Sequence, residues 1–225
     1  MKKKILLSWS SGKDSAWTLY LLRQQQTYEV SGLITTINSA FDRVAMHSSR
    51  RALVEMQAAA AGLPLIAVPL PWPCSNVDYE CAMKKVCDEA VAQGVSAIAF
   101  GDLFLEEIRK YREAMLAATN ITPLFPLWGR NTLALAKEMI NAGIKAVITC
   151  VDSKKLDSSF VGRQFDEQLL SDFPSDVDPC GEHGEFHTFV YDGSMFCNSI
   201  SISTGVVVER NGCVFIDILN ADDAS

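Results

Sequence analysis

The sequence lacks any apolar stretch that approaches the ~20 residues of a membrane-spanning helix. Its basic start, residues 1–4, leads into an apolar run that is too short for a secretory signal. It also lacks a Cys-x-x-Cys pair, and an odd count of seven scattered cysteines is typical of free thiols in a reducing compartment. We therefore expect a cytoplasmic protein with no membrane association.

Positive charge is scarce, since 20 Lys and Arg stand against 27 Asp and Glu, a formal net charge of −7. Sequence-independent binding of nucleic acid relies on many Lys and Arg contacts to phosphate, so this balance argues against nucleic acid as a partner. Two local basic groups, at residues 50–51 and 109–112, are more typical of solvated helix faces. The hydrophobic content of 48% predicts a compact globular fold.

Short apolar runs alternate with helical patterns along the first two thirds of the chain. Strands are predicted at residues 5–7, 30–34, 65–70, 97–100 and 146–151. Helices are predicted at residues 14–25, 48–61, 76–93, 104–118 and 132–142. Such alternation favours an α/β fold, a Rossmann-like parallel sheet with helices on both faces.

After residue 156 the sequence pattern changes, and short segments are separated by turn residues. The pair Asn211-Gly212 between the β-rich runs 206–210 and 213–219 is a strong hairpin signal. Residues 186–191 read as a further strand. We therefore expect a smaller α+β portion from residue 152 to residue 225.

Residues 8–15, Ser-Trp-Ser-Ser-Gly-Lys-Asp-Ser, stand between an apolar run and a helical pattern. Small residues let the backbone curl, and the N–H groups at a helix N-terminus favour an anion. Helix capping alone accounts for Asp14 and Ser15, but a cation such as Lys13 opposes the helix dipole unless an anion is bound. The loop is not a Walker A motif, because position 7 is Leu7 rather than glycine. The pattern predicts a site for the phosphates of a nucleotide.

Residues 178–188, Asp-Pro-Cys-Gly-Glu-His-Gly-Glu-Phe-His-Thr, form a second dense group of functional residues. Gly181 and Gly184 permit close approach of the backbone to a ligand. Glu182 and Glu185 could bind an ammonium group, orient ammonia or hold a metal. A glycine-rich turn with exposed charges is the plain alternative.

Cys180, His183 and His187 also have a Cys-x2-His-x3-His spacing that could supply three zinc ligands. A structural zinc site needs a fourth ligand, and the sequence has no second Cys/His pair nearby. A nucleotide-dependent enzyme would more simply use Mg²⁺.

The two motifs resemble those of the diphthine-ammonia ligase family of ATP pyrophosphatases, in the same order and along nearly the whole chain. The loop is similar to the family's PP-loop, Ser-Gly-Gly-Lys-Asp-Ser, with Ser11 in place of the first glycine. If that position has a positive φ angle, Ser11 is strained there. The block at residues 181–188 resembles Gly-Glu-x-Gly-Glu-aromatic-x-Thr, with His187 where the family usually has glutamate. Further matches in the family's order are His47, Gly101-Asp102, residues 126–132 and residues 156–163.

The resemblance implies a HUP-type PP-loop ATP pyrophosphatase domain at residues 1–151 and a substrate-binding domain at residues 152–225. It implies that ATP is split between its α- and β-phosphates, that a carboxylate becomes an acyl-adenylate, and that ammonia displaces AMP to give an amide. ATP and Mg²⁺ are the implied cofactors. The acceptor would be diphthine on elongation factor 2, or a small-molecule acid if the source is bacterial. The resemblance leaves open whether the chain forms a homodimer.

The resemblance also implies roles for single residues. Lys13, Glu182 and Glu185 are the expected catalytic residues, the two glutamates handling the acceptor and ammonia. Asp14 is expected to bind Mg²⁺ or to cap the helix, and Asp102 to contact a ligand or to cap the helix that follows it. The β- and γ-phosphates are expected on the loop, and Ser8 and His47 are expected to border the adenosine. The residues expected to contact the nucleotide are Ser8, Ser10, Ser11, Gly12, Lys13, Asp14, Ser15, His47, Gly101 and Asp102.

Two other functions stay open on the sequence. A PP-loop enzyme that modifies tRNA is one, although the acidic balance and the missing Cys-x-x-Cys motif argue against it. An ATP-binding sensor without ligase activity is the other.

Overall fold

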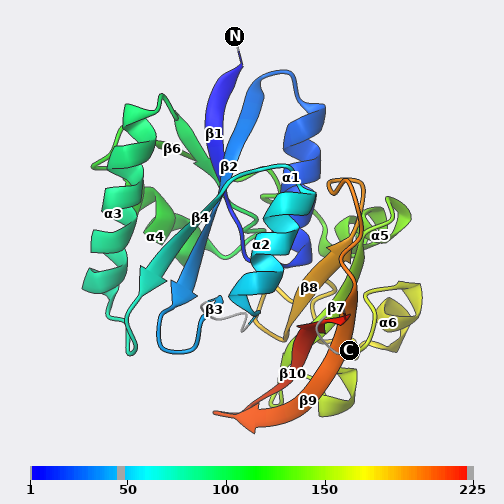
Figure 1. The fold of residues 1–225 in the computed structure, drawn as a ribbon. Helices are drawn as coiled ribbons and strands as arrows, with labels where there is room; N and C mark the ends of the chain where they lie inside the picture. The colour runs from blue at the N-terminus through cyan, green and yellow to red at the C-terminus, as the bar shows by residue number, and fades with distance from the viewer. Residues whose placement is uncertain (1, 45–48, 222–225) are drawn as a thin grey trace.

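The computed structural model describes residues 2–44 and 49–221, which form two β-sheets with helices around and between them (Figure 1). The first sheet contains β1 (Lys3–Ser8), β2 (Tyr28–Asn38), β3 (Arg43–Val44), β4 (Leu65–Leu70), β5 (Ala97–Ala99) and β6 (Thr122–Leu124). The second contains β7 (Lys145–Asp152), β8 (Phe186–Asp192), β9 (Ile202–Arg210) and β10 (Cys213–Asn220). The helices are α1 (Lys13–Gln24), α2 (Arg51–Ala60), α3 (Asn76–Ala92), α4 (Glu106–Leu116), α5 (Thr132–Asn141), η1 (Ser158–Phe160) and α6 (Glu167–Asp172).

The first sheet is parallel except for the short β3, which pairs antiparallel with β2. Alternating side chains of β1 face opposite ways: Ile5 and Leu7 pack in a core with α1 and α2, and Leu6 packs with α3 and α4. The predicted parallel sheet with helices on both faces is therefore confirmed (Figure 1). The edge strand β6 was not predicted, because three residues that include Pro123 give almost no strand signal.

The run at residues 146–151 is a strand as predicted, but it does not belong to the parallel sheet. It lies inside β7, which pairs antiparallel with β8 and with β10 at the centre of the second sheet. Its residues are buried on both faces. A fully apolar run indicates such burial, but it does not indicate whether the neighbouring strands are parallel or antiparallel. The division at residue 151 remains a prediction, and the position of β7 favours an earlier one.

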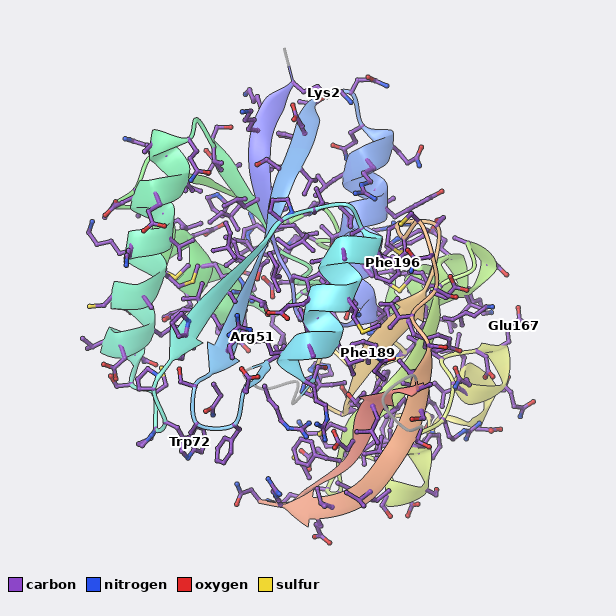
Figure 2. All side chains as sticks on the ribbon, viewed as in Figure 1. Lys2, Arg51, Trp72, Glu167, Phe189 and Phe196 are labelled. Carbon is purple, nitrogen blue, oxygen red and sulfur yellow. The ribbon has the colours of Figure 1, made fainter. Side chains whose placement is uncertain are left out.

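The second sheet has the order β8-β7-β10-β9. The predicted hairpin is confirmed: β9 and β10 pair across Asn211 and Gly212, whose φ angles are 54° and 79°. Helix α2 covers this sheet as well as the first, since Leu53 and Ala60 pack in one cluster with Phe189, a strand residue labelled in Figure 2.

Ion pairs add a polar link between the two sheets. Asp217 of β10 accepts hydrogen bonds from Arg43 of β3, at 2.9 Å, and from Arg50, at 2.5 and 3.1 Å. The pairing of β10 with β9 is irregular between Ile216 and Ile218, so Asp217 stands at a bulge, where a strand can re-aim a side chain. No helix that the structure describes is long and apolar enough to cross a membrane.

Candidate active site

The loop between β1 and α1 is tightly curled around its serines. Ser11 is buried and has a φ angle of 71°, so the strain that the sequence suggested for this position is present. The Ser15 hydroxyl donates to the carbonyl of Gly12 at 2.9 Å and lies 3.2 Å from the Ser10 hydroxyl. The N-cap residue of α1 is Gly12, which has no side chain to cap the helix, so N–H groups of the first turn can face an anion.

The second sheet holds this loop from the side. The N–H of Val190 donates to the carbonyl of Ser11 at 3.0 Å, and the N–H of Lys13 donates to the Thr188 hydroxyl at 3.1 Å. The amide of Gln57 in α2 donates to both the Ser11 and Val190 carbonyls, at 3.0 and 2.6 Å. The conformation of the loop therefore depends on β8 and α2 together.

The side chain of Lys13 is 2% exposed and lies in a cluster with the 178–188 segment. Its ammonium donates to Asp14 at 2.9 Å and to the carbonyl of Cys180, and it lies 5.3 Å from the centre of the Phe186 ring. Burial alone lowers the pKa of Lys13, but attraction to Asp14 and to neighbouring acidic groups outweighs it and keeps this pKa above its ordinary value. Lys13 is therefore a charged residue at the junction of the two sheets.

The two predicted catalytic glutamates have different surroundings. Glu182 accepts from the N–H of Leu103 at 2.8 Å, and burial raises the pKa of its carboxyl to about 7, against the effect of that hydrogen bond. Glu185 is 3% exposed and accepts from the N–H of Asp178 at 3.0 Å. Its other oxygen has no hydrogen-bond partner in the described part of the chain. Glu182 is thus suited to exchange a proton near neutral pH, and Glu185 to accept a bond from a ligand.

A cavity of about 490 Å³ opens beside the loop. This volume lies in the range of small-molecule sites. Of the described residues that were predicted to bind the nucleotide, Ser8 and Ser10 line it, and the others belong to the buried loop or to the end of β5. His47 lies outside the described residues. The cavity walls include Ile34, Thr36, Leu70, Asn76, Tyr79, Ile98, Phe100, Arg112 and His187.

Asp102 forms a two-pronged ion pair with Arg112, at 2.5 and 3.1 Å, and Arg112 lies 4.4 Å from the centre of the Phe100 ring. The alternative that Asp102 caps the next helix is wrong, because α4 begins at Glu106 after Leu105. Arg112 was missed because a basic run in a helical pattern is most often a solvated face.

Gly101 has a packing role at the end of β5. A Cβ atom there would lie 3.1 Å from the carbonyl carbon of Asp14 and 3.2 Å from the amide nitrogen of Ser15. Glycine therefore lets this strand end approach the first turn of α1. The predicted contact of Gly101 with a nucleotide stays a prediction.

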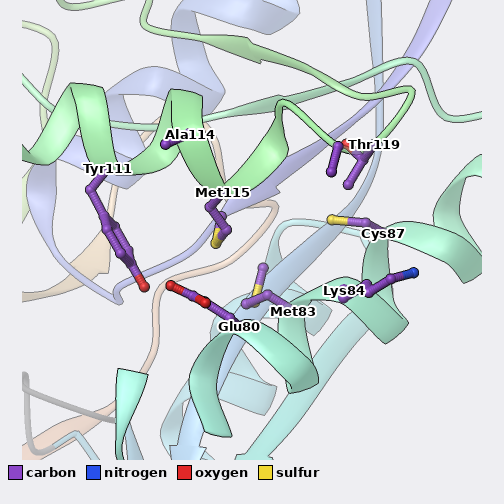
Figure 3. A pocket seen from close by; sticks show the side chains of 9 residues that line it. Glu80, Met83, Lys84, Cys87, Tyr111, Ala114, Met115 and Thr119 are labelled. Atoms are coloured by element: carbon purple, nitrogen blue, oxygen red, sulfur yellow. The ribbon is translucent and has the colours of Figure 1, made fainter. Parts of the chain in front are cut away.

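A smaller hollow of about 280 Å³ lies between α3 and α4 (Figure 3). Met83 and Tyr111 line both hollows, so the smaller one adjoins the cavity. The Cys87 thiol and the Met115 side chain face it (Figure 3). It holds no residue that the sequence predicted to be functional.

Zinc ligation finds no support in the geometry. Among the described residues no three His, Cys, Asp or Glu side chains are grouped to hold a metal ion. Burial raises the pKa of the Cys180 thiol, which opposes the thiolate form that zinc requires, and the ring of His183 packs on Phe104 at 5.0 Å. Mg²⁺ makes a different demand, because it commonly takes one or two carboxylates together with substrate phosphates. Asp14, in the first turn of α1 with its side chain 26% exposed, fits that demand.

Comparisons with known proteins agree with this arrangement. Residues 1–119 match the sequence model of the diphthamide synthase N-terminal domain, and residues 131–219 match that of the C-terminal domain. A diphthine–ammonia ligase of Bos taurus is 31% identical over 142 residues, which cover 60% of this chain and 52% of that protein. One of Danio rerio is 28% identical over 185 residues, covering 73% and 71% of the two chains.

The chain thus spans about half the length of the bovine relative. Among solved structures, a predicted subunit of tRNA methyltransferase from Methanocaldococcus jannaschii overlaps 69% of this chain and 81% of its own, with 18% identity and a TM-score of 0.42. The two domain matches follow the order of the fold and together take up most of the sequence. The chain belongs to the diphthamide synthase family.

Proposed function

We propose that the chain is an ATP-dependent ligase that joins ammonia to a substrate carboxylate through an acyl-adenylate. The observation that carries the proposal is the junction of the two sheets. There the N-terminus of α1 and the charged Lys13 lie near Glu182, whose carboxyl has a pKa of about 7, and Ser10 of the same loop lines a cavity of about 490 Å³. The names of the relatives suggest diphthine as the acceptor, and a small-molecule acid is the alternative.

In the first step, an oxygen of the substrate carboxylate attacks the α-phosphorus of ATP, and the bond to the β-phosphate breaks. The leaving pyrophosphate carries negative charge, which the loop N–H groups and Lys13 stabilise. Mg²⁺, when bound, would neutralise part of the same charge, with Asp14 as its protein ligand. Lys13 and Asp14 form an ion pair at 2.9 Å, which holds both side chains in place.

In the second step, ammonia attacks the acyl carbon, the amide C–N bond forms, and AMP leaves. Ammonium must lose a proton to become a nucleophile, and a carboxylate with a pKa of about 7 can accept one. We assign this role to Glu182. Glu185, with one carboxylate oxygen unpartnered among the described residues, would accept a hydrogen bond from ammonium and orient it.

The test is incubation of the protein with ATP, Mg²⁺, ammonium and a metabolite extract, followed by assay of AMP and pyrophosphate. We expect both products together from the wild type, and at least a hundredfold less from Lys13→Met, which keeps the buried chain length but removes the charge. Lys84→Met, at an exposed position of α3, is the matched control and should keep wild-type turnover.

Circular dichroism and urea unfolding establish that Lys13→Met is folded. Release of ADP in place of AMP would contradict α,β-cleavage. Bound ATP without turnover, in the presence of diphthine-bearing elongation factor 2 as well as the extract, would favour a sensor over a ligase.

A further inference from the structure

One wall of the cavity comes from the second sheet. Of the lining residues that the structure describes, His187 alone belongs to β8, and the others belong to the first sheet, to α3 and α4, and to their connections. On either side of it, Phe186 and Thr188 contact Lys13. Because side chains alternate along a strand, the imidazole of His187 lies on the other side of β8, at the cavity with Ser8 and Ser10.

The register of β8 fixes this position. His187 pairs with Cys150 of β7, and the hydroxyl of Thr149 donates to its carbonyl at 3.3 Å. The neighbouring Thr188 and Val190 are bonded to the loop between β1 and α1. The backbone of β8 at His187 is therefore fixed relative to the loop that forms the predicted phosphate site.

The imidazole of His187 is neutral at pH 7. Burial lowers the pKa of its imidazole to about 4, and the positive charge of Lys13 adds to this effect. A neutral imidazole carries one N–H donor at pH 7. Two cationic side chains lie at or near the cavity: Arg112, which donates to Asp102 through two nitrogens, and Lys13, whose ammonium donates to Asp14 and to the Cys180 carbonyl.

We propose that His187 is a phosphate ligand, which donates its imidazole N–H to a phosphate oxygen of the nucleotide bound in the cavity. The Ser8 and Ser10 hydroxyls line the same cavity and supply further donors. The inference rests on the proposed function, because it takes ATP as the ligand. It adds that the second sheet, in addition to supporting the loop, contacts the nucleotide itself.

Titration calorimetry with ATP and with adenosine tests the proposal, since adenosine has the base and sugar but no phosphate. We expect His187→Phe to weaken ATP binding about tenfold, because a hydrogen bond to a charged group is lost, and to leave adenosine binding within about twofold. His187→Gln keeps an N–H donor and should retain ATP affinity within about threefold. His183→Ala, in the adjoining loop and packed on Phe104, is the matched control and should bind both ligands like the wild type.

Ring-nitrogen NMR of the histidine-labelled wild type gives a readout that does not depend on the folding of a variant. The His187 signal is assigned by its absence from His187→Gln, and ATP, but not adenosine, should shift it. Equal weakening of ATP and adenosine binding in His187→Phe, or unchanged ATP binding, would overturn the proposal. A wild type that binds no ATP would overturn the proposed function as well, which separates the two failures.

Discussion

Ser11 holds a conformation that serine ordinarily avoids. A left-handed φ angle costs roughly 1–2 kcal/mol for a residue with a Cβ atom, and at Ser11 it is 71°. The surroundings fix it: the hydroxyl lies 2.7 Å from that of Ser49, and the carbonyl accepts from the backbone of Val190 and the side chain of Gln57. Strain of this kind persists where neighbouring contacts determine the backbone, and here it shapes the loop.

Substitution of Ser11 should separate strain from hydrogen bonding. Ser11→Ala keeps the strain and leaves the buried Ser49 hydroxyl without this partner, so we expect a loss of about 1–2 kcal/mol in the free energy of unfolding. Ser11→Gly loses the same bond but relieves the strain, so it should be about 1 kcal/mol more stable than Ser11→Ala. Urea unfolding measures both, and an alanine variant as stable as the glycine variant would show that the strain is absent.

The edge strand β8 joins the two halves of the molecule at the level of elements. An edge strand offers unpaired backbone groups, and β8 offers them to the loop before α1. We call the hydrogen bonds of Ser11, Gln57 and Val190 the joint between β8 and the loop. Gln57 of α2 belongs to it because its amide donates to the Ser11 and Val190 carbonyls, and its side-chain oxygen accepts from the indole N–H of Trp9 at 2.8 Å. The joint is polar and fully buried, so each of its hydrogen bonds has to be made.

Gln57→Leu should disrupt the joint with little change in volume. The substitution leaves the Trp9 indole and the Val190 carbonyl without this partner, and buried groups left in that way cost about 1–3 kcal/mol each. We expect a loss of about 2–4 kcal/mol in urea unfolding and weaker binding of ATP. Gln24→Leu, at an exposed position of α1, is the control. A loss below about 1 kcal/mol in the free energy of unfolding would contradict the view that each of these hydrogen bonds has to be made.

Local sequence patterns predicted where helices and strands lie better than they predicted which strands pair with one another. Strands β1, β2, β4 and β5, the helices between them and the hairpin at Asn211-Gly212 follow from periodicity and turn chemistry, which are local. The sheet membership of β7 does not, because a buried run reads alike in either sheet. Arg112 and His187 reach the cavity only through the packing of α4 and β8, so no local spacing indicated that they meet Ser8 and Ser10.

At the scale of the whole molecule, the protonation of His187 and that of Glu182, both at the sheet junction, change stability with pH in opposite directions. The His187 pKa of about 4 is below its ordinary value of 6.5, so the unfolded chain binds more protons between these pH values and stability rises with pH. The Glu182 pKa of about 7 is above its ordinary value of 4.5, so the folded chain binds more protons and stability falls as pH rises.

We expect the effects of His187 and Glu182 to offset each other between about pH 4.5 and 6.5, and the burial of Asp14, which raises the pKa of its carboxyl, to add to the fall of stability with pH in the wild type. His187→Gln should expose the falling trend and Glu182→Gln the rising one, each on the order of 2 kcal/mol across this range. Urea unfolding at a series of pH values measures all three proteins. Parallel curves for the two variants would contradict the opposite shifts.

The contact between the loop and β8 also sets an order of events during synthesis. The N–H of Lys13 meets the hydroxyl of Thr188, which lies 175 residues later in the chain. In a nascent chain that has not yet reached β8, the loop between β1 and α1 is translated but lacks the hydrogen bonds that hold its conformation. The loop therefore reaches its final conformation only after at least 175 further residues have been translated, so the segment between β1 and α1 is made long before it can mature.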